Sequence, residues 1–261
     1  ISVDTPTNNF ATWNPIDKKS NITLSEGNLR VVNTSSTWDS IRASFSPTSG
    51  KWYFETVIPA IWNYGHVGLL QNKYEIDEGD AYEDAGSWTY QIDGRTHNNN
   101  VESNPPPASV VGDIVQVAYD VDAGKIWWGI NNTWMLSGNP TTAANPVYTG
   151  ITGDISPQIL IYGSPATGLV TNFGQDSSFA GTKTAQGNQD GNEIGDFYYT
   201  PPTGFLALCT SNLPDVAVVP SEHFQTALYT GDATGNQAIT GVGFQPDFVW
   251  LKRRDGTASH H

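Results

Sequence analysis

The sequence predicts an all-β protein, and three features support this prediction. Short apolar runs are separated by stretches rich in Gly, Pro, Asn, Thr and Ser, and no long helical pattern occurs. Aromatic residues are abundant, with nine Trp, eleven Tyr and ten Phe. The 261 residues suffice for one large β domain or two smaller ones, with an ample apolar core.

Alternation of side chains places strands along the first half of the chain. Residues 1–20 are predicted to be an extended lead-in, because "PTNNFATWNP" offers turns and prolines. In "KWYFETVI", at 51–58, one face holds Trp52, Phe54, Thr56 and Ile58, and the other holds Lys51, Tyr53, Glu55 and Val57. Further strands are predicted at 28–33, 41–45, 66–70 and 87–93, with loops at 71–87 and 94–109.

The clearest hairpin follows at residues 113–131. "DIVQVAYD" alternates, "VDAG" turns, and "KIWWGIN" alternates back. Asp120 and Asp122 flank the turn, where Asx-turn hydrogen bonding explains them better than a metal pair. Trp127 and Trp128 must face opposite sides of their strand. We therefore expect one in the core and the other covered by a loop, a neighbouring domain or a partner.

The remaining chain predicts more strands and then a second, incomplete module. "ISPQILIYG" and "LVTNFG" are strand-like, residues 175–196 form a polar excursion, and "FYYTPPTGFLALC" returns to the sheet. Residues 211–222 are predicted to be a linker. Residues 223–261 then suggest the opening strands of a C-terminal β module, too short for a stable domain of its own.

The charge of the chain limits the kinds of partner that it can bind. Acidic residues outnumber basic ones by 26 to 12, which gives a net charge of −14 and argues against nucleic-acid binding. No apolar stretch is long enough to span a membrane, and no signal peptide is visible. The single Cys, Cys209, allows no intrachain disulfide and is expected to be a small buried residue. Because the chain opens without Met, we expect it to be a piece of a longer polypeptide.

The order of these strands resembles the SPRY family over roughly residues 40–175. The most specific match is "GDIVQVAYDVDAGKIWWGINNTW" at 112–134; Asn131-Asn132 stands where Asn-Gly is usual. Other matching segments are "SGKWYFE" (49–55), "HVGLL" (66–70), "GSWTYQIDGRTHNNN" (86–100), "ISPQILI" (155–161) and "VTNFG" (170–174). The resemblance implies a concanavalin A-like jelly roll, a sandwich of two antiparallel sheets, over residues 21–210. It also implies a binding module whose loops meet the partner.

The flanking segments resemble large structural proteins of tailed bacteriophages. The matching stretches are "VDTPTNNFATWNP", "PPTGFLAL" and "ITGVGFQPDFVWLKRRDG". This resemblance implies a tail-fibre or spike type appendage of a virion, facing the extracellular side. Its partners would be other virion proteins and a glycan or receptor on the host surface, and a homo-oligomer, a trimer by analogy, is expected.

The acidic stretch "YEIDEGDAYEDAG" at 74–86 allows three interpretations. Laminarinase-type glycosidases share the jelly roll and use a Glu-x-Asp-x-Glu strand, of which Glu75 and Asp77 match the first two positions. The third position is Gly79, or Asp80 through a bulge, so we expect no enzyme. Carboxylates of Glu75, Asp77 and Asp80 could instead bind calcium. The third interpretation is a solvated loop.

Aromatic and amide side chains near predicted loops are the candidates for ligand binding. Aromatic rings can stack on sugar rings, and amides can hydrogen-bond hydroxyl groups. The candidates are Trp62, Asn63, Tyr64, Tyr82, Trp88, Asn98, Asn99, Asn100 and Trp134.

His66 and His97 are isolated in the sequence and are expected to be structural or surface residues.

Overall fold

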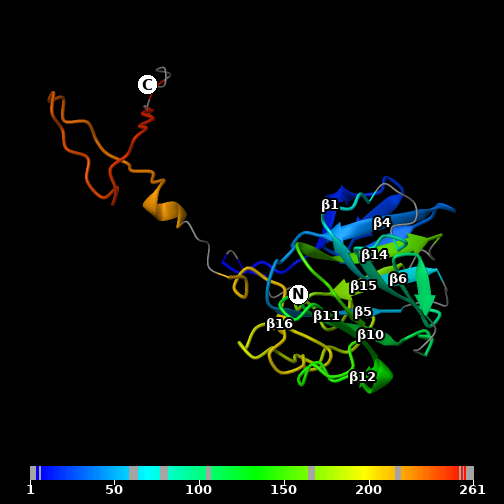
Figure 1. The fold of residues 1–261 in the computed structure, drawn as a ribbon. Coiled ribbons are helices and arrows are strands. Elements are labelled where there is room, and N and C mark those ends of the chain that lie inside the picture. Colours follow the sequence, from blue (N-terminus) through cyan, green and yellow to red (C-terminus); the bar gives the residue numbers. More distant parts are fainter. Residues whose placement is uncertain are drawn as a thin grey trace. The chain divides into compact units, whose positions relative to one another are not determined.

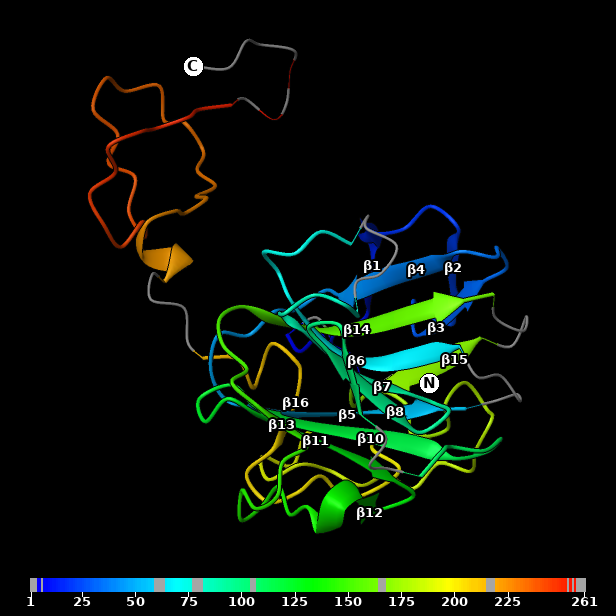
Figure 2. The same cartoon turned by 45° about the vertical axis from the view of Figure 1, so that its right-hand side comes forward.

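Two antiparallel sheets stack face to face in the computed structural model (Figures 1 and 2). The structure describes residues 4–5, 7–58, 64–76, 82–103, 107–163, 168–214, 219–252, 254 and 256. The chain divides into two units, Ile1–Leu213 and Pro214–His261, and every strand found within the described residues belongs to the first. The predicted fold class, an all-β sandwich of two antiparallel sheets, is confirmed.

The strand order shows how the sequence is distributed between the sheets. One sheet has seven strands in the order β1-β4-β14-β6-β7-β8-β9. The other has nine strands, in the order β12-β11-β10-β5-β15-β3-β2, with β13 antiparallel beside β11 and the short β16 parallel beside β5. The strands of the seven-stranded sheet are β1 (Trp13–Lys18), β4 (Trp38–Ala43), β6 (Gly65–Gln71), β7 (Ser87–Gln91), β8 (Arg95–Asn98), β9 (Val101–Ser103) and β14 (Ile155–Tyr162). Those of the nine-stranded sheet are β2 (Ile22–Ser25), β3 (Arg30–Asn33), β5 (Lys51–Val57), β10 (Ile114–Asp120), β11 (Lys125–Ile130), β12 (Thr133–Trp134), β13 (Tyr148–Thr149), β15 (Leu169–Asn172) and β16 (Leu206–Ala207).

The predicted hairpin is formed by β10 and β11. The two strands pair antiparallel, from Val115 opposite Ile130 to Asp120 opposite Lys125. The Asp120 carboxylate accepts a hydrogen bond from the backbone N–H of Ala123, three residues on, at 2.8 Å, so it stabilises the turn without the two-residue spacing of the predicted Asx turn. Asp122 instead accepts from the N–H of Gly50 at 3.1 Å and so joins this turn to the segment before β5, which differs from the predicted Asx-turn role.

Trp127 and Trp128 face opposite sides of β11, as alternation predicts. Trp128 lies in the main core between the sheets, with Phe54, Tyr119 and Val67. Trp127 lies on the outer face, in a second apolar cluster that also contains Tyr53, Phe197, Phe205 and Cys209. Because this outer cluster covers the outer face of β5, β10 and β11, this part of the nine-stranded sheet is buried on both faces. Cys209 is fully buried, as expected.

Two segments predicted to lack strands contain them. Residues 94–109 hold the β8–β9 hairpin, whose two-residue turn is Asn99–Asn100 between the paired Asn98 and Val101. Both turn residues have positive φ, 52° and 57°, which Asn tolerates better than most residues and which matches the twist of a tight hairpin. Within the expected lead-in 1–20, β1 pairs with β4, and Trp13 is fully buried.

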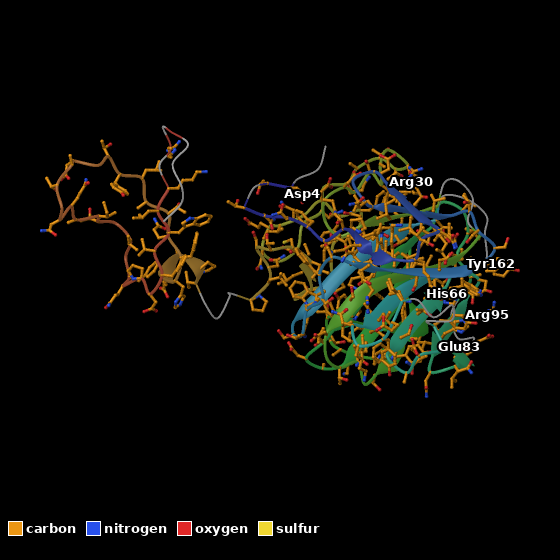
Figure 3. All side chains as sticks on the ribbon, turned by 90° about the horizontal axis from the view of Figure 1, so that it is seen from above. Asp4, Arg30, His66, Glu83, Arg95 and Tyr162 are labelled. Carbon is orange, nitrogen blue, oxygen red and sulfur yellow. The ribbon has the colours of Figure 1, made fainter. Side chains whose placement is uncertain are left out.

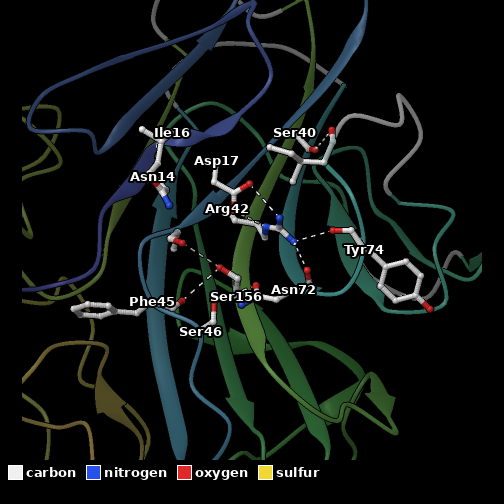
Figure 4. Close-up of polar contacts among 12 residues, drawn as sticks. Asn14, Ile16, Asp17, Ser40, Arg42, Phe45, Ser46, Asn72, Tyr74 and Ser156 are labelled. Atoms are coloured by element: carbon white, nitrogen blue, oxygen red, sulfur yellow. Dashed lines mark hydrogen bonds and ion pairs between the residues drawn. The ribbon is translucent and has the colours of Figure 1, made fainter.

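The beginning of the acidic stretch lies over the outer face of the seven-stranded sheet. Arg42 of β4 is 8% exposed and binds the Asp17 carboxylate through Nε at 2.8 Å. Its guanidinium also donates to the carbonyl oxygens of Asn72 and Tyr74, at 3.2 and 2.8 Å (Figure 4). The Ser40 hydroxyl donates to the carbonyl of Ile76 at 3.1 Å. Residues 72–76 therefore form an anchored cover over polar sheet residues.

The C-terminal unit differs from the prediction of opening strands. Its described residues contain one short 3₁₀ helix, Pro220–Glu222, and no strand. None of its described residues is buried, and large apolar side chains such as Phe224, Leu228 and Phe248 are more than 70% exposed. Alternation alone does not form a strand, because each strand needs a partner to satisfy its backbone groups. No helix within the described residues is long and apolar enough to cross a membrane.

Candidate functional site

Sheet register gathers outward-facing residues of several strands at one end of the seven-stranded sheet. Trp38 of β4 lies opposite Tyr162 of β14, and the backbone N–H of Tyr162 donates to the carbonyl of Tyr64 at 3.0 Å. On the next strand pair, His66 of β6 lies opposite Gln91 of β7. Further along the same face, β8 contributes Arg95 and His97, and β9 contributes Glu102.

These residues surround a hollow of about 230 Å³, to which we refer as the Trp38 hollow. It is formed by strand residues together with residues of the loop between β6 and β7 and of the β8–β9 turn. In Figure 3, His66, Glu83, Arg95 and Tyr162 lie on the same side of the sandwich. The lining residues are Trp38, Tyr64, His66, Tyr82, Glu83, Gln91, Arg95, His97, Asn100 and Glu102.

Trp38 is the centre of the aromatic part of the hollow. Its ring centroid lies 5.1 Å from that of His66 and 5.7 Å from that of Tyr82. Tyr162 and Tyr64 are at 5.5 and 6.3 Å, in tilted and edge-to-face arrangements. Trp38 is nevertheless only partly buried, and Tyr64 is 50% exposed. The rings of this cluster therefore pack against one another, while part of their surface is exposed to solvent.

Two buried histidines form the base of the hollow. The ring centroids of His66 and His97 are 5.0 Å apart, so two residues that are isolated in the sequence are neighbours in the fold. Burial lowers the pKa of His66 well below its ordinary value, and His97 and Arg95 act in the same direction. Burial also lowers the pKa of His97, against the opposing effect of Glu102. Both rings are thus neutral at neutral pH.

Hydrogen bonds define how each imidazole presents its nitrogens. The Gln91 amide donates to Asp93 at 3.0 Å, so its oxygen faces Nε2 of His97, 3.0 Å away. A neutral His97 therefore carries its proton on Nε2 and has a lone pair on Nδ1. Nδ1 of His66 pairs with the Thr89 hydroxyl at 3.0 Å. Nε2 of His66 has no hydrogen-bond partner among the described residues, although the residue is only 1% exposed.

The charged residues of the hollow are mostly acidic. Arg95 binds Asp93 through Nε at 2.9 Å and Glu102 through a terminal nitrogen at 3.0 Å. These bonds raise the pKa of Arg95 further above its already high value. Glu83 lines the hollow without a hydrogen bond or ion pair among the described residues.

Three of the sequence-predicted ligand residues line this hollow: Tyr64, Tyr82 and Asn100. Trp88 is 4% exposed in the core between the sheets, so its ring is not accessible to a ligand. Asn98 donates to the carbonyls of Ala85 and Ser87, at 3.1 and 2.8 Å, and thereby supports the hairpin.

The other candidates lie elsewhere or are not described. Asn99 belongs to the β8–β9 turn, and Trp134 packs against the outer cluster of the nine-stranded sheet. Trp62 and Asn63 lie outside the described residues.

Sequence reasoning missed Trp38, His66, Gln91, Arg95 and His97. The outward direction of these side chains could be predicted from the sequence, since Val67 on β6 and Tyr90 on β7 alternate with them and point to the core. Their proximity could not be predicted, because β14, which is distant in the sequence, lies between β4 and β6 and pairs with both.

The acidic stretch shows no catalytic or metal geometry in its described part. Glu75 is exposed and lies outside any strand. Asp77 and Asp80 are outside the described residues, so the expectation that they are not catalytic, and the alternative that they bind calcium, stay predictions. Within the part of the chain that the structure describes, no three His, Cys, Asp or Glu side chains are placed to hold a metal ion.

A second hollow, of about 380 Å³, lies near Asp4, Glu26 and Asp176. Its acidic groups already have local roles. Asp4 accepts from the N–H of Phe10 at 2.8 Å, and Asp176 accepts from the N–H groups of Ser178 and Ala180 at 2.9 and 2.8 Å. These carboxylates therefore stabilise the surrounding loops, and no ligand is needed to explain their position in this hollow.

Comparisons with known proteins agree with this architecture. The SPRY domain family model matches residues 51–176, and a domain of unknown function (DUF7483) matches residues 219–261. No curated protein matches the chain in sequence.

Solved structures show the same likeness. The SPRY domain of human HERC1 aligns with a TM-score of 0.50 and 16% identity, covering 61% of this chain and 96% of that one. The TRIM65 PSpry domain aligns at 0.47 and 12% identity, covering 62% of this chain and 88% of that one. Stonustoxin aligns at 0.49 and 16%, covering 62% and 26%. The two sheets with the Trp38 hollow on one outer face thus form a SPRY-type jelly-roll sandwich, and the SPRY family match spans β5 to β15.

Proposed function

We propose that this chain is a non-enzymatic binding module that engages a protein partner through the Trp38 hollow. One observation supports this most directly. The hollow exposes part of a cluster of aromatic rings around His66, whose buried Nε2 has no hydrogen-bond partner in the part of the chain that the structure describes. An unsatisfied buried polar group costs about 1–3 kcal/mol, and a ligand that bonds it recovers part of this cost. The similarity to SPRY domains supports a protein–protein interaction module rather than a catalytic one.

The setting that we propose is the appendage of a phage virion, on its extracellular-facing side. The resemblance of the flanking segments to phage structural proteins supports this. In that setting the module contributes to assembly with other virion proteins and to attachment at the host surface, where a glycan is an alternative partner. Labelling of intact particles with antibody against this chain would place it on the tail appendage; unlabelled tails would contradict the setting.

The absence of enzymatic activity is also a proposal, supported by the location of Glu75. A retaining glycosidase needs two carboxylates about 5–5.5 Å apart on one cleft face. Glu75 is exposed and lies on a segment anchored by its carbonyl groups to Arg42 and Ser40, not on a strand. We expect no reducing sugar to be released from β-glucans or host-envelope polysaccharides. Turnover that disappears in Glu75→Gln/Asp77→Asn would revive the enzyme interpretation.

The binding proposal can be tested by selection from a random peptide library, with an array of host-type glycans screened in parallel. We expect peptides enriched by the wild-type chain to lose most of their binding to Trp38→Leu, because that change removes the central ring of the hollow. Trp134→Leu is the matched control, since Trp134 is a half-buried Trp at another location. Melting temperatures verify that both variants fold.

Three outcomes would contradict the binding proposal. Peptides that bind Trp38→Leu as well as the wild type would locate binding elsewhere. Enrichment of glycans without peptides would replace the protein partner by a carbohydrate. Failure to enrich a ligand from either collection would argue for an architectural spacer.

A further inference from the structure

We propose that the Trp38 hollow receives a basic side chain, lysine or arginine, of the protein partner. This inference rests on the proposed binding function and specifies the chemistry of the contact. Three features of the hollow point to a cation: its charge balance, its aromatic rings, and the lone pairs of its two neutral histidines.

The charge balance of the hollow is negative. Glu83 and Glu102 line it, and Asp93 borders it through its bonds to Arg95 and Gln91. Three carboxylates against the single guanidinium of Arg95 leave a net charge of −2, with both histidines neutral. Three of the five N–H donors of Arg95 are engaged by Asp93 and Glu102, so its positive charge is already paired with two carboxylates. The whole chain, at −14, adds long-range attraction for basic partners.

The aromatic rings favour the same ligand. Trp38, Tyr64 and Tyr82 line the hollow, and the face of such a ring attracts a cation that lies within about 6 Å of it. A lysine or arginine side chain also has an aliphatic stem that packs on apolar ring surface while its head remains polar. The volume of about 230 Å³ suits one such side chain rather than a longer segment.

The histidines supply acceptors that a cation can use. Nδ1 of His97 has a lone pair and makes no hydrogen bond to the described residues. His66 can keep its proton on Nδ1, where the Thr89 hydroxyl accepts it at 3.0 Å, and then presents a lone pair on Nε2. Ammonium and guanidinium groups are pure donors, so they complement these lone pairs. A carboxylate ligand would meet lone pairs and acidic groups instead.

The test uses the full chain with nitrogen-15 label and small probes of defined charge. The cationic probes are n-butylammonium and n-butylguanidinium; sodium butyrate and methyl β-glucopyranoside are the anionic and sugar probes. We expect both cations to shift the Trp38 indole and the His66 and His97 ring signals in a saturable manner. Trp38→Phe assigns the indole signal.

Two variants with the same change of charge locate the effect. Glu83→Gln should weaken cation binding by about threefold to tenfold, because it removes one partly exposed carboxylate from the hollow. Glu193→Gln removes one carboxylate from the exposed turn near Asp190 and should leave binding unchanged. Neither side chain is buried, so both variants are expected to fold.

Each contrary result has a distinct meaning. Stronger shifts of these signals by butyrate or by the glucoside would overturn the basic side chain and leave the binding module standing. Equal weakening in Glu83→Gln and Glu193→Gln would reduce the effect to general attraction by an acidic chain and overturn the site. Absence of shifts with either cation would also overturn the inference, whereas the proposed function is decided by the library selection.

Discussion

Replacing Glu55 by Ala is expected to lower the free energy of unfolding by about 3 kcal/mol. Glu55 lies on the outer face of β5 and is fully buried. Its carboxyl group accepts hydrogen bonds from the backbone N–H groups of Tyr198 and Tyr199, at 2.9 and 2.8 Å. It also accepts from the Tyr53 hydroxyl at 2.8 Å and from the Asn172 amide at 3.4 Å. Alanine leaves these buried donors without an acceptor.

The measurement is urea unfolding combined with hydrogen exchange of the Tyr198 and Tyr199 amides. These amides should lose protection in Glu55→Ala before the core of the sandwich does, because the carboxyl group anchors the segment after residue 195 to β5. A loss of stability below about 1 kcal/mol would show that water replaces the carboxyl group, and would contradict the anchoring role.

The same carboxyl group makes stability depend on pH. Burial raises the pKa of Glu55 from 4.5 to about 7, against the hydrogen bonds that favour its ionised form. A raised folded-state pKa means that the folded protein binds the proton more tightly, so the contribution of Glu55 is full below pH 4.5. It is lost as the pH rises through about 7, by roughly 3 kcal/mol in total. Glu55→Gln should remove this fall from the pH profile of unfolding; a profile identical to the wild type would contradict the assignment.

Replacing Trp128 by Ala is expected to destabilise the protein by about 4 kcal/mol. Trp128 is fully buried in the core, and its indole nitrogen donates to the carbonyl of Val67 at 3.0 Å. Since Trp128 belongs to β11 and Val67 to β6, this bond joins the nine-stranded sheet to the seven-stranded sheet. Alanine removes the bond and leaves a cavity between the sheets.

Two further variants separate packing from the hydrogen bond in urea unfolding. Trp128→Phe keeps most of the apolar volume and should cost about 2 kcal/mol, part of it from the lost bond. Trp134→Ala, at a half-buried position outside the main core, should cost less than Trp128→Ala by about 2 kcal/mol or more. If Trp128→Phe is as stable as the wild type, the bond between the sheets makes no net contribution.

The sequence by itself determined the fold class, most strand positions and the β10–β11 hairpin. Period-two alternation is a local signal, and it correctly separated Trp128 from Trp127 on β11 and Phe54 from Tyr53 on β5. It failed where the local signal was ambiguous. Asn98 to Asn100 were predicted to lie in a loop, although the positive φ of Asn99 and Asn100 is what a tight hairpin needs.

Only the tertiary structure decided where the candidate site lies. Trp38, His66 and His97 face outward on β4, β6 and β8, and no local pattern states which strands become neighbours. The insertion of β14 between β4 and β6 is a long-range pairing that brings Tyr162 beside Trp38. Likewise, the sequence predicted a loop at Glu75 but not what holds it: Arg42 binds the carbonyls of Asn72 and Tyr74 and keeps that segment as a cover over the sheet. Local side-chain direction follows from backbone geometry, but proximity between strands depends on pairing across the whole chain.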